Sequence, residues 1–161
     1  MKIVFVCSAN ACRSPMAEGF AKKLLSENGV SSLTVDSAGL DAFEGTPPTE
    51  EAIEVMKARG VDIASHRSKP FSPHLGKNDM VLTMTKSQKE RILAEHPTLA
   101  GRTFMLDEYA RNKPEDIPDP FKGQVSYEDV ADHIESSVKL VLGLSSRHRK
   151  KQFVSDFLKL F

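Results

Sequence analysis

The sequence has no tryptophan, only two cysteines and no net charge, with 22 Lys and Arg against 22 Asp and Glu in 161 residues. Two cysteines cannot form the disulfide framework of a small secreted domain, nor a four-ligand zinc site without histidines. A balanced charge leaves no excess of positive charge that would indicate binding to nucleic acid or to an anionic membrane surface. No apolar run approaches the ~18 residues of a membrane-spanning helix. We therefore expect one globular domain that binds no nucleic acid.

The N-terminus has too short an apolar run for a secretion signal. Residues 3–6 are apolar, whereas the hydrophobic region of a signal needs about 7–15 residues. This predicts a cytoplasmic protein. Thiols stay reduced in the cytoplasm, so each cysteine is catalytic, metal-binding or part of the core.

Apolar runs and helix-start signals alternate along the chain. Strands are expected at residues 3–6, 33–35, 80–84 and 103–106. Helices are expected to begin at Ser14-Pro15, at Thr46-Pro47-Pro48, after Thr85 (a capping box with Gln88) and after Ser126. The alternation predicts an α/β fold, a single-domain four-stranded parallel sheet with helices on both faces, doubly wound and Rossmann-like. The domain is expected to span residues 1–149, followed by a basic and apolar tail over 150–161.

The segment between the first strand and the first helix carries the clearest chemistry. Ligands of such sheets bind beyond the carboxyl ends of the strands, and Cys7 directly follows the first strand. A loop there can turn successive N–H groups toward one centre, and the helix N-terminus adds partial positive charge. Arg13 offers a planar fork of donors that matches phosphate oxygens. A thiol in such a field ionises readily. Together these features predict a nucleophile, an oxyanion-binding loop and a bidentate clamp.

The alternative role for Cys7 is purely structural, a buried thiol at a strand end, because the spacing C-x5-R also arises by chance. Its place between a buried strand and a Ser-Pro helix start favours the functional interpretation. Ser14 has two candidate roles. It either caps the helix or donates its hydroxyl to the thiolate.

This segment resembles the signature of the low-molecular-weight protein tyrosine phosphatases, V-C-x-G-N-x-C-R-S-P. The sequence here is Val6-Cys7-Ser8-Ala9-Asn10-Ala11-Cys12-Arg13-Ser14-Pro15, and three further blocks match in order: Ser37-Ala38-Gly39, His66-Arg67-Ser68 and Asp119-Pro120-Phe121. The resemblance covers the chain up to about residue 149. Ala9 departs from the family glycine, and Ala11 is smaller than the residue usual there.

The resemblance implies a role for each matching residue. Cys7 would be the nucleophile and Arg13 the phosphate clamp, with residues 8–13 donating main-chain N–H groups. The remaining roles are support of the loop by Asn10, Ser14, Ser37 and His66, and walls of the substrate pocket at Leu40 and Phe121. Asparagine suits the loop because it tolerates left-handed backbone angles and carries both donor and acceptor. The substrate would be a phosphorylated protein, and phosphate and vanadate would inhibit, with neither metal nor cofactor required.

Asp119 is implied as the general acid that protonates the leaving group, a role worth about 10²–10⁴ in rate. It lies in a proline-rich loop over residues 112–123 that is too long for a simple connector. An Asp-Pro pair is also ordinary turn chemistry, and Asp116 is a rival carboxylate. The family match selects Asp119. The same residue would then take a proton from the water that hydrolyses the cysteinyl phosphate.

Cys12 and the tail have two interpretations each. Cys12 forms a reversible disulfide with Cys7 or simply packs. The tail, basic at Arg147 and Lys151 and apolar afterwards, is a helix on its own domain in the favoured interpretation, or else contacts a membrane or partner.

Four functions were compared. Phosphotyrosine hydrolysis is the first choice, and phosphoarginine hydrolysis by the same loop chemistry is the nearest rival. Arsenate reductases share the fold but relay electrons through cysteines well downstream, and no cysteine follows Cys12. A non-catalytic phosphopeptide-binding module would be expected to lack Cys7 or Asp119. By resemblance, tyrosine-directed members carry a large aliphatic residue at position 11 and arginine-directed members a threonine, so Ala11 fits neither pattern.

Overall fold

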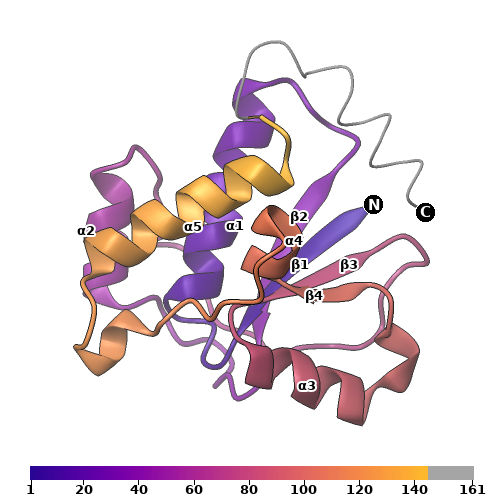
Figure 1. Cartoon of the computed structure of the whole chain (residues 1–161). Coiled ribbons are helices and arrows are strands. Elements are labelled where there is room, and N and C mark those ends of the chain that lie inside the picture. Colours follow the sequence, from indigo (N-terminus) through magenta and orange to yellow (C-terminus); the bar gives the residue numbers. More distant parts are fainter. Residues whose placement is uncertain (145–161) are drawn as a thin grey trace.

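The computed structural model describes residues 1–144 and shows one parallel sheet between helices (Figure 1). The strands are β1 (Lys2–Cys7), β2 (Thr34–Gly39), β3 (Met80–Thr83) and β4 (Thr103–Met105), in the order β2-β1-β3-β4. All neighbouring strands pair in parallel. The predicted fold class is confirmed. The predicted boundary at residue 149 and the tail lie outside the described residues.

Strand β1 is buried on both faces, as its uninterrupted apolar sequence predicts. Because side chains alternate along a strand, Ile3, Phe5 and Cys7 face one hydrophobic core, and Val4 and Val6 face the other.

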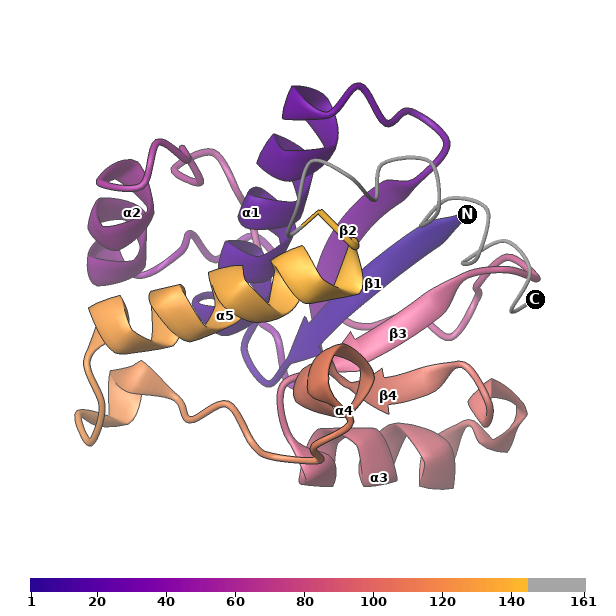
Figure 2. The same cartoon turned by 45° about the horizontal axis from the view of Figure 1, so that its top comes forward.

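The larger core lies under α1 (Arg13–Glu27), α2 (Glu50–Lys57), α4 (Leu106–Arg111) and α5 (Tyr127–Val141). The smaller core lies under α3 (Lys86–Glu95), which covers the opposite face (Figure 2). Two short 3₁₀ helices, Pro97–Leu99 and Pro120–Lys122, complete the elements. Within residues 1–144, no helix is long and apolar enough to cross a membrane.

Two predicted helix starts are wrong, and two are confirmed. Ser126 caps α5, and Thr85 forms the predicted capping box with Gln88. Helix α1 begins at Arg13, two residues before the expected first helical residue Pro15, and the hydroxyl of Ser14 is directed to the Cys7 thiol and not to the helix end. Helix α2 is capped by Thr49 and not by Thr46, whose hydroxyl donates to the carbonyl oxygen of Phe43 and closes a turn instead.

The sequence predicts a fourth strand that continues to residue 106, and it does not predict helix α4. The strand ends at Met105, and Glu108 accepts a hydrogen bond from the Met105 N–H, which starts a helix there. The order of the strands makes β1 the place where the chain changes direction along the sheet, since its two neighbours are β2 and β3. Ligand sites of such sheets lie at the carboxyl end of this strand, where Cys7 stands.

Candidate active site

A cavity of about 260 Å³ opens at the carboxyl end of β1, over the loop that leads into α1. Cys7, Ala11 and Arg13 line it from the loop side, and Asp119 and Phe121 line it from the segment before α5. The structure therefore brings together the predicted nucleophile and clamp, which are six residues apart in the sequence, and the predicted acid, which follows them by more than a hundred residues.

The Cys7 thiol lies at the base of this loop with two polar neighbours. Its Sγ accepts a hydrogen bond from the Asn10 N–H at 3.3 Å and lies 2.9 Å from Ser14 Oγ. The Ser14 hydroxyl in turn accepts a hydrogen bond from Asn10 Nδ2 at 2.9 Å, and its own proton has two acceptors within reach. These are the Cys7 sulfur at 2.9 Å and the Ala38 carbonyl oxygen at 3.4 Å, of which the sulfur is nearer. Both polar neighbours of the thiol are hydrogen-bond donors that stabilise a thiolate. Of the two roles considered for Ser14, the structure shows the thiol contact.

Asn10 holds the loop in a strained turn. Its φ is 54°, in the left-handed region, and its side chain is fully buried. The amide Nδ2 also donates to Ser37 Oγ at 2.9 Å, and Oδ1 accepts from the Lys69 N–H at 3.0 Å. The structure thus brings Asn10, Ser14 and Ser37 together, as the resemblance implies.

His66 and Ser68 hold the same loop from outside. His66 Nε2 lies 3.0 Å from the carbonyl oxygen of Asn10, and Ser68 Oγ donates to that oxygen at 2.7 Å. His66 is therefore a support of the loop in this structure and not an isolated surface histidine.

The carbonyl groups of the loop are anchored away from its centre. The oxygens of Cys7 and Ser8 accept the N–H groups of Leu40 and Asp41 at 3.0 and 2.9 Å, and that of Ala11 accepts the Thr49 N–H at 3.0 Å. In a planar trans peptide the N–H points opposite to the C=O. Anchoring the carbonyls outward therefore turns the N–H groups that follow them toward the centre, which creates a cradle for an anion.

Arg13 completes the cradle with a guanidinium that the fold holds in place. Its side chain is only 7% exposed, and Nη1 donates to the carbonyl oxygen of Ile117 at 2.9 Å. Nη2 lies 3.7 Å from Asp119 Oδ2. Because Ile117 is two residues before Asp119, the same arginine positions the acid-bearing loop beside the cradle.

Asp119 and its rival Asp116 have different surroundings. Asp119 lines the cavity with its side chain one-quarter exposed, and Oδ1 accepts the Phe121 N–H at 3.0 Å. Asp116 Oδ1 accepts the Lys86 N–H at 2.8 Å, at the start of α3, and it does not line the cavity. The geometry favours Asp119.

Ala9, in the position of the family glycine, needs no glycine here. Among residues 1–144, Asn10 and Asn112 are the only non-glycine residues with positive φ. A glycine is needed instead at Gly39 in β2, where a Cβ would lie 2.6 Å from the Ser8 oxygen and 2.9 Å from the Asn10 nitrogen. The loop packs directly on the backbone of the neighbouring strand.

The predicted walls have different positions. Phe121 lines the cavity and is 72% exposed, so it is available to a substrate. Leu40 is not among the residues that line the cavity in the described chain, and it packs against the smaller core. Thr46, Pro47 and Thr49 also line the cavity, which sequence reasoning missed. The available signal is the proline pair after the second strand, but on its own this pair predicts only a helix start.

Cys12 also lines the cavity but differs from Cys7 in its environment. Its side chain is buried, and its Sγ lies 3.8 Å from Met16 Sδ. Burial first, and then the nearby Asp119 and Cys7, raise the pKa of the Cys12 thiol strongly, against the opposing effect of Arg13. Both cysteines are unpaired in this structure.

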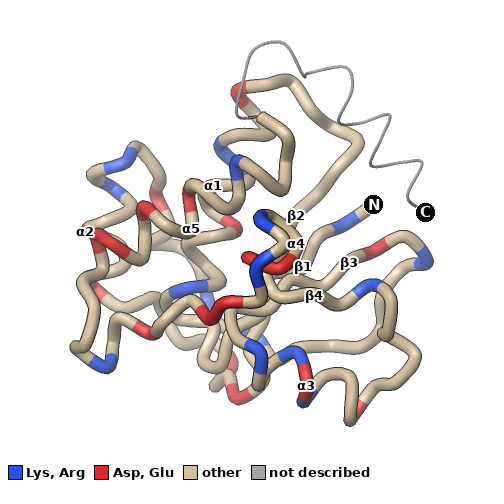
Figure 3. Tube along the Cα trace, in the orientation of Figure 1, with Lys and Arg blue, Asp and Glu red and all other residues tan. Residues whose placement is uncertain are grey.

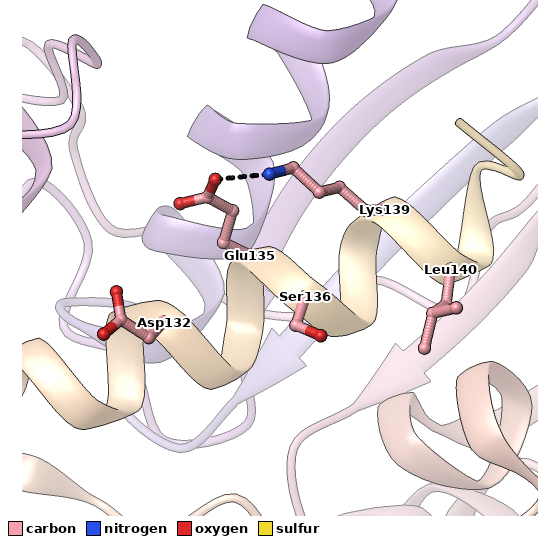
Figure 4. Close-up of a pocket in the computed structure, with 5 residues that line it drawn as sticks. All are labelled: Asp132, Glu135, Ser136, Lys139 and Leu140. Atoms are coloured by element: carbon pink, nitrogen blue, oxygen red, sulfur yellow. Dashed lines mark hydrogen bonds and ion pairs between the residues drawn. The ribbon is translucent and has the colours of Figure 1, made fainter. Parts of the chain in front are cut away.

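The other surfaces of the described chain offer less chemistry. A groove of about 320 Å³ along α5 is lined by Asp132, Glu135, Ser136, Lys139 and Leu140, with Lys139 donating to Glu135 at 2.7 Å (Figure 4). It contains no thiol and no arginine. Basic and acidic residues are interspersed along the chain (Figure 3). Within residues 1–144, no group of three or more His, Cys, Asp or Glu side chains is placed to hold a metal ion.

Comparison with known proteins gives one consistent result. The family model for low molecular weight phosphotyrosine protein phosphatase matches residues 2–152. A probable low molecular weight protein-tyrosine-phosphatase EpsP from Ralstonia solanacearum is 38% identical over 138 residues, which are 84% of this chain and 90% of that protein. A protein-arginine-phosphatase from Geobacillus stearothermophilus is 33% identical, over 85% of this chain and 90% of that protein. A solved structure of a mutant of the YwlE arginine phosphatase, with a phosphorylated active site serine, has a TM-score of 0.81 at 29% identity, over 94% of this chain and all of that one.

Proposed function

This chain belongs to the low molecular weight phosphotyrosine protein phosphatase family, and from that membership we propose that it hydrolyses phosphotyrosine in proteins through a phosphate ester of Cys7. The observation that carries the proposal is the position of the Cys7 thiol. It lies at the base of a loop whose N–H groups face one centre, in the cavity that Arg13 and Asp119 also line.

The first step is an in-line displacement at phosphorus. The inward N–H groups and Arg13 bind the three non-bridging oxygens, and the charge on those oxygens is stabilised without any movement of the loop. The Cys7 sulfur forms a bond to phosphorus while the bond to the leaving oxygen breaks. Asp119 gives its proton to that oxygen, so the substrate side chain departs neutral.

The second step reverses the role of Asp119. Its carboxylate takes a proton from a water molecule, the water oxygen attacks phosphorus, and the S–P bond breaks. Inorganic phosphate is released, and the sulfur returns as a thiolate stabilised by Ser14 and the Asn10 N–H. Because the product occupies the same cradle, phosphate and its analogue vanadate should inhibit. A thiolate nucleophile also requires a reducing compartment such as the cytosol.

Phosphotyrosine is preferred because the walls of the cavity suit a ring. Phe121 and Pro47 line the cavity with apolar surface, and the small side chain of Ala11 leaves room for a ring. A phosphoarginine substrate carries a guanidinium, which binds more tightly where a carboxylate without another partner is available. Among the described residues, Asp119 is the only carboxylate that lines the cavity, and it already accepts the Phe121 N–H and lies beside Arg13. Phosphoarginine remains the second candidate because a relative named for that activity is 33% identical.

The test is turnover by the full chain with EDTA present. We expect hydrolysis of p-nitrophenyl phosphate and of a phosphotyrosine peptide, with a smaller kcat/KM for a phosphoarginine peptide of the same sequence. Cys7→Ala should abolish all three activities while leaving the fold intact by circular dichroism. Binding of the peptides without turnover would identify a binding module, and a larger kcat/KM for the phosphoarginine peptide would reverse the order of the two substrates.

A further inference from the structure

Tyr127, at the first position of α5, reaches from the helix to the phosphate-binding loop. Its hydroxyl accepts a hydrogen bond from Thr49 Oγ1 at 3.3 Å. The ring is half-buried between α2 and α5, which lie side by side in both views of the fold (Figures 1 and 2). The mechanism above gives this residue no task.

Thr49 connects Tyr127 to the backbone of the loop. Its N–H donates to the carbonyl oxygen of Ala11 at 3.0 Å, and its Oγ1 accepts the Ala52 N–H at 3.3 Å as the cap of α2. A threonine hydroxyl has one proton to donate, and here that proton goes to Tyr127.

The backbone contact of Thr49 acts on one peptide group of the loop. The carbonyl of Ala11 and the N–H of Cys12 belong to the same planar unit, so the anchor of the carbonyl sets the direction of the N–H. Thr49 holds the carbonyl from outside, and Tyr127 holds the side chain of Thr49. We propose that Tyr127 is a positioning residue which, with Thr49, braces the Ala11–Cys12 peptide so that its N–H points at the bound phosphoryl group.

The Ala11 end of the loop depends on the link between Tyr127 and Thr49 more than the end at Cys7 and Ser8 does. The Asn10 oxygen is held twice, by His66 and Ser68, and the Cys7 and Ser8 oxygens are held by the chain that directly follows β2. Among the described residues, the Ala11 oxygen accepts a hydrogen bond only from the Thr49 N–H, in a loop whose preceding residues Thr46 and Pro47 are exposed. The link to α5 ties that loop to the core.

The surroundings of Tyr127 favour the neutral form of its hydroxyl. Burial first, and then the nearby Cys12, Glu51 and Asp119, raise its pKa, against the opposing hydrogen bond of Thr49.

The inference rests on the proposed phosphatase activity and is tested by Tyr127→Phe, which removes only the hydroxyl. Loss of one donor of an oxyanion cradle costs about 10²–10³ in kcat, so a donor that is misaligned and not removed should cost about 5–30-fold in kcat/KM. The loss should be equal for good and poor leaving groups, because the cradle contacts the non-bridging oxygens. The inhibition constant of vanadate should rise by a similar factor. Tyr109→Phe, in the chain's other tyrosine on α4 beside Phe104, is the matched control and should keep wild-type values.

Thr49 variants test whether the two residues act through one link. Thr49→Ser keeps the hydroxyl and should stay near the wild type, whereas Thr49→Val should lose activity at least as strongly as Tyr127→Phe. Residues that act through the same contact are not additive, so the double variant Tyr127→Phe/Thr49→Val should match Thr49→Val alone.

The outcomes separate this inference from the proposed function. A lower melting temperature in Tyr127→Phe with unchanged kcat/KM and vanadate inhibition would make the residue merely structural and overturn the brace. The brace would also be overturned if the fold-losses in kcat/KM of the two single variants multiply in the double variant. If the wild-type chain neither turns over a phosphoester nor binds vanadate, the phosphatase proposal itself has failed.

Discussion

Replacing Asn10 should cost more stability than any other single change in the loop, because its side chain has both a hydrogen-bonding and a backbone role. Asn10→Ala removes three buried hydrogen bonds, two from Nδ2 to Ser14 and Ser37 and one from the Lys69 N–H to Oδ1. At about 1 kcal/mol each, they contribute about 3 kcal/mol. Alanine also adopts a φ of 54° less readily than asparagine, which adds about 1 kcal/mol. The expected total is about 4 kcal/mol.

Asn10→Gly separates the two contributions. It loses the same hydrogen bonds, but glycine accepts positive φ without strain, so it should be about 1 kcal/mol more stable than Asn10→Ala. The assay is urea unfolding followed by circular dichroism, with kcat/KM measured in parallel. Both variants should lose activity, since the Ser14 hydroxyl loses its partner beside the Cys7 thiol. A cost below about 1.5 kcal/mol for alanine, or a glycine variant no more stable than alanine, would refute this reasoning.

Three further predictions concern the acid, the substrate and the second cysteine. Asp119→Ala should lower kcat/KM, which reports the first step, by about 10²–10⁴ for poor leaving groups and little for p-nitrophenyl phosphate, whereas Asp116→Ala should stay within about twofold on both; equal small effects of the two variants would remove the acid from Asp119. Ala11→Ile should shift the ratio of kcat/KM values toward phosphotyrosine and Ala11→Thr toward phosphoarginine, by about 10–200-fold, and an unchanged ratio in matched peptides would show that position 11 is not the gate. Iodoacetamide should modify Cys7 and spare Cys12 in the folded protein at pH 7–9, because the raised pKa keeps the buried Cys12 thiol protonated; mass spectrometry would show the reverse, or equal labelling, if that is wrong.

The features that are predicted best from the sequence are those that depend on neighbouring residues in the chain. The apolar run of β1, the capping box at Thr85 and the cap at Ser126 each depend on neighbouring residues, and the structure has all three. Cys7, Arg13 and Asp119 were found by their motifs, and the parallel sheet then explains how they meet.

The features that were missed depend on contacts between distant residues. A Ser-Pro pair is a good helix start on its own, but Ser14 is turned away by a thiol and an amide that only the folded loop places beside it. The wall formed by Thr46 and Thr49, and the link from Thr49 to Tyr127, join residues up to 78 positions apart. Leu40 follows β2 as the resemblance implies, but its side chain faces the smaller core.

The most direct test of the account is to find the phosphate on Cys7 during turnover. Asp119→Ala should still form the intermediate from p-nitrophenyl phosphate, whose leaving group needs no acid, but should hydrolyse it slowly because no base activates the water. Acid quenching followed by mass spectrometry, with fragmentation to separate Cys7 from Cys12, should show one phosphoryl group on Cys7 and none in Cys7→Ala/Asp119→Ala. A phosphoryl group on another residue, or continued turnover in Cys7→Ala, would contradict the central claim.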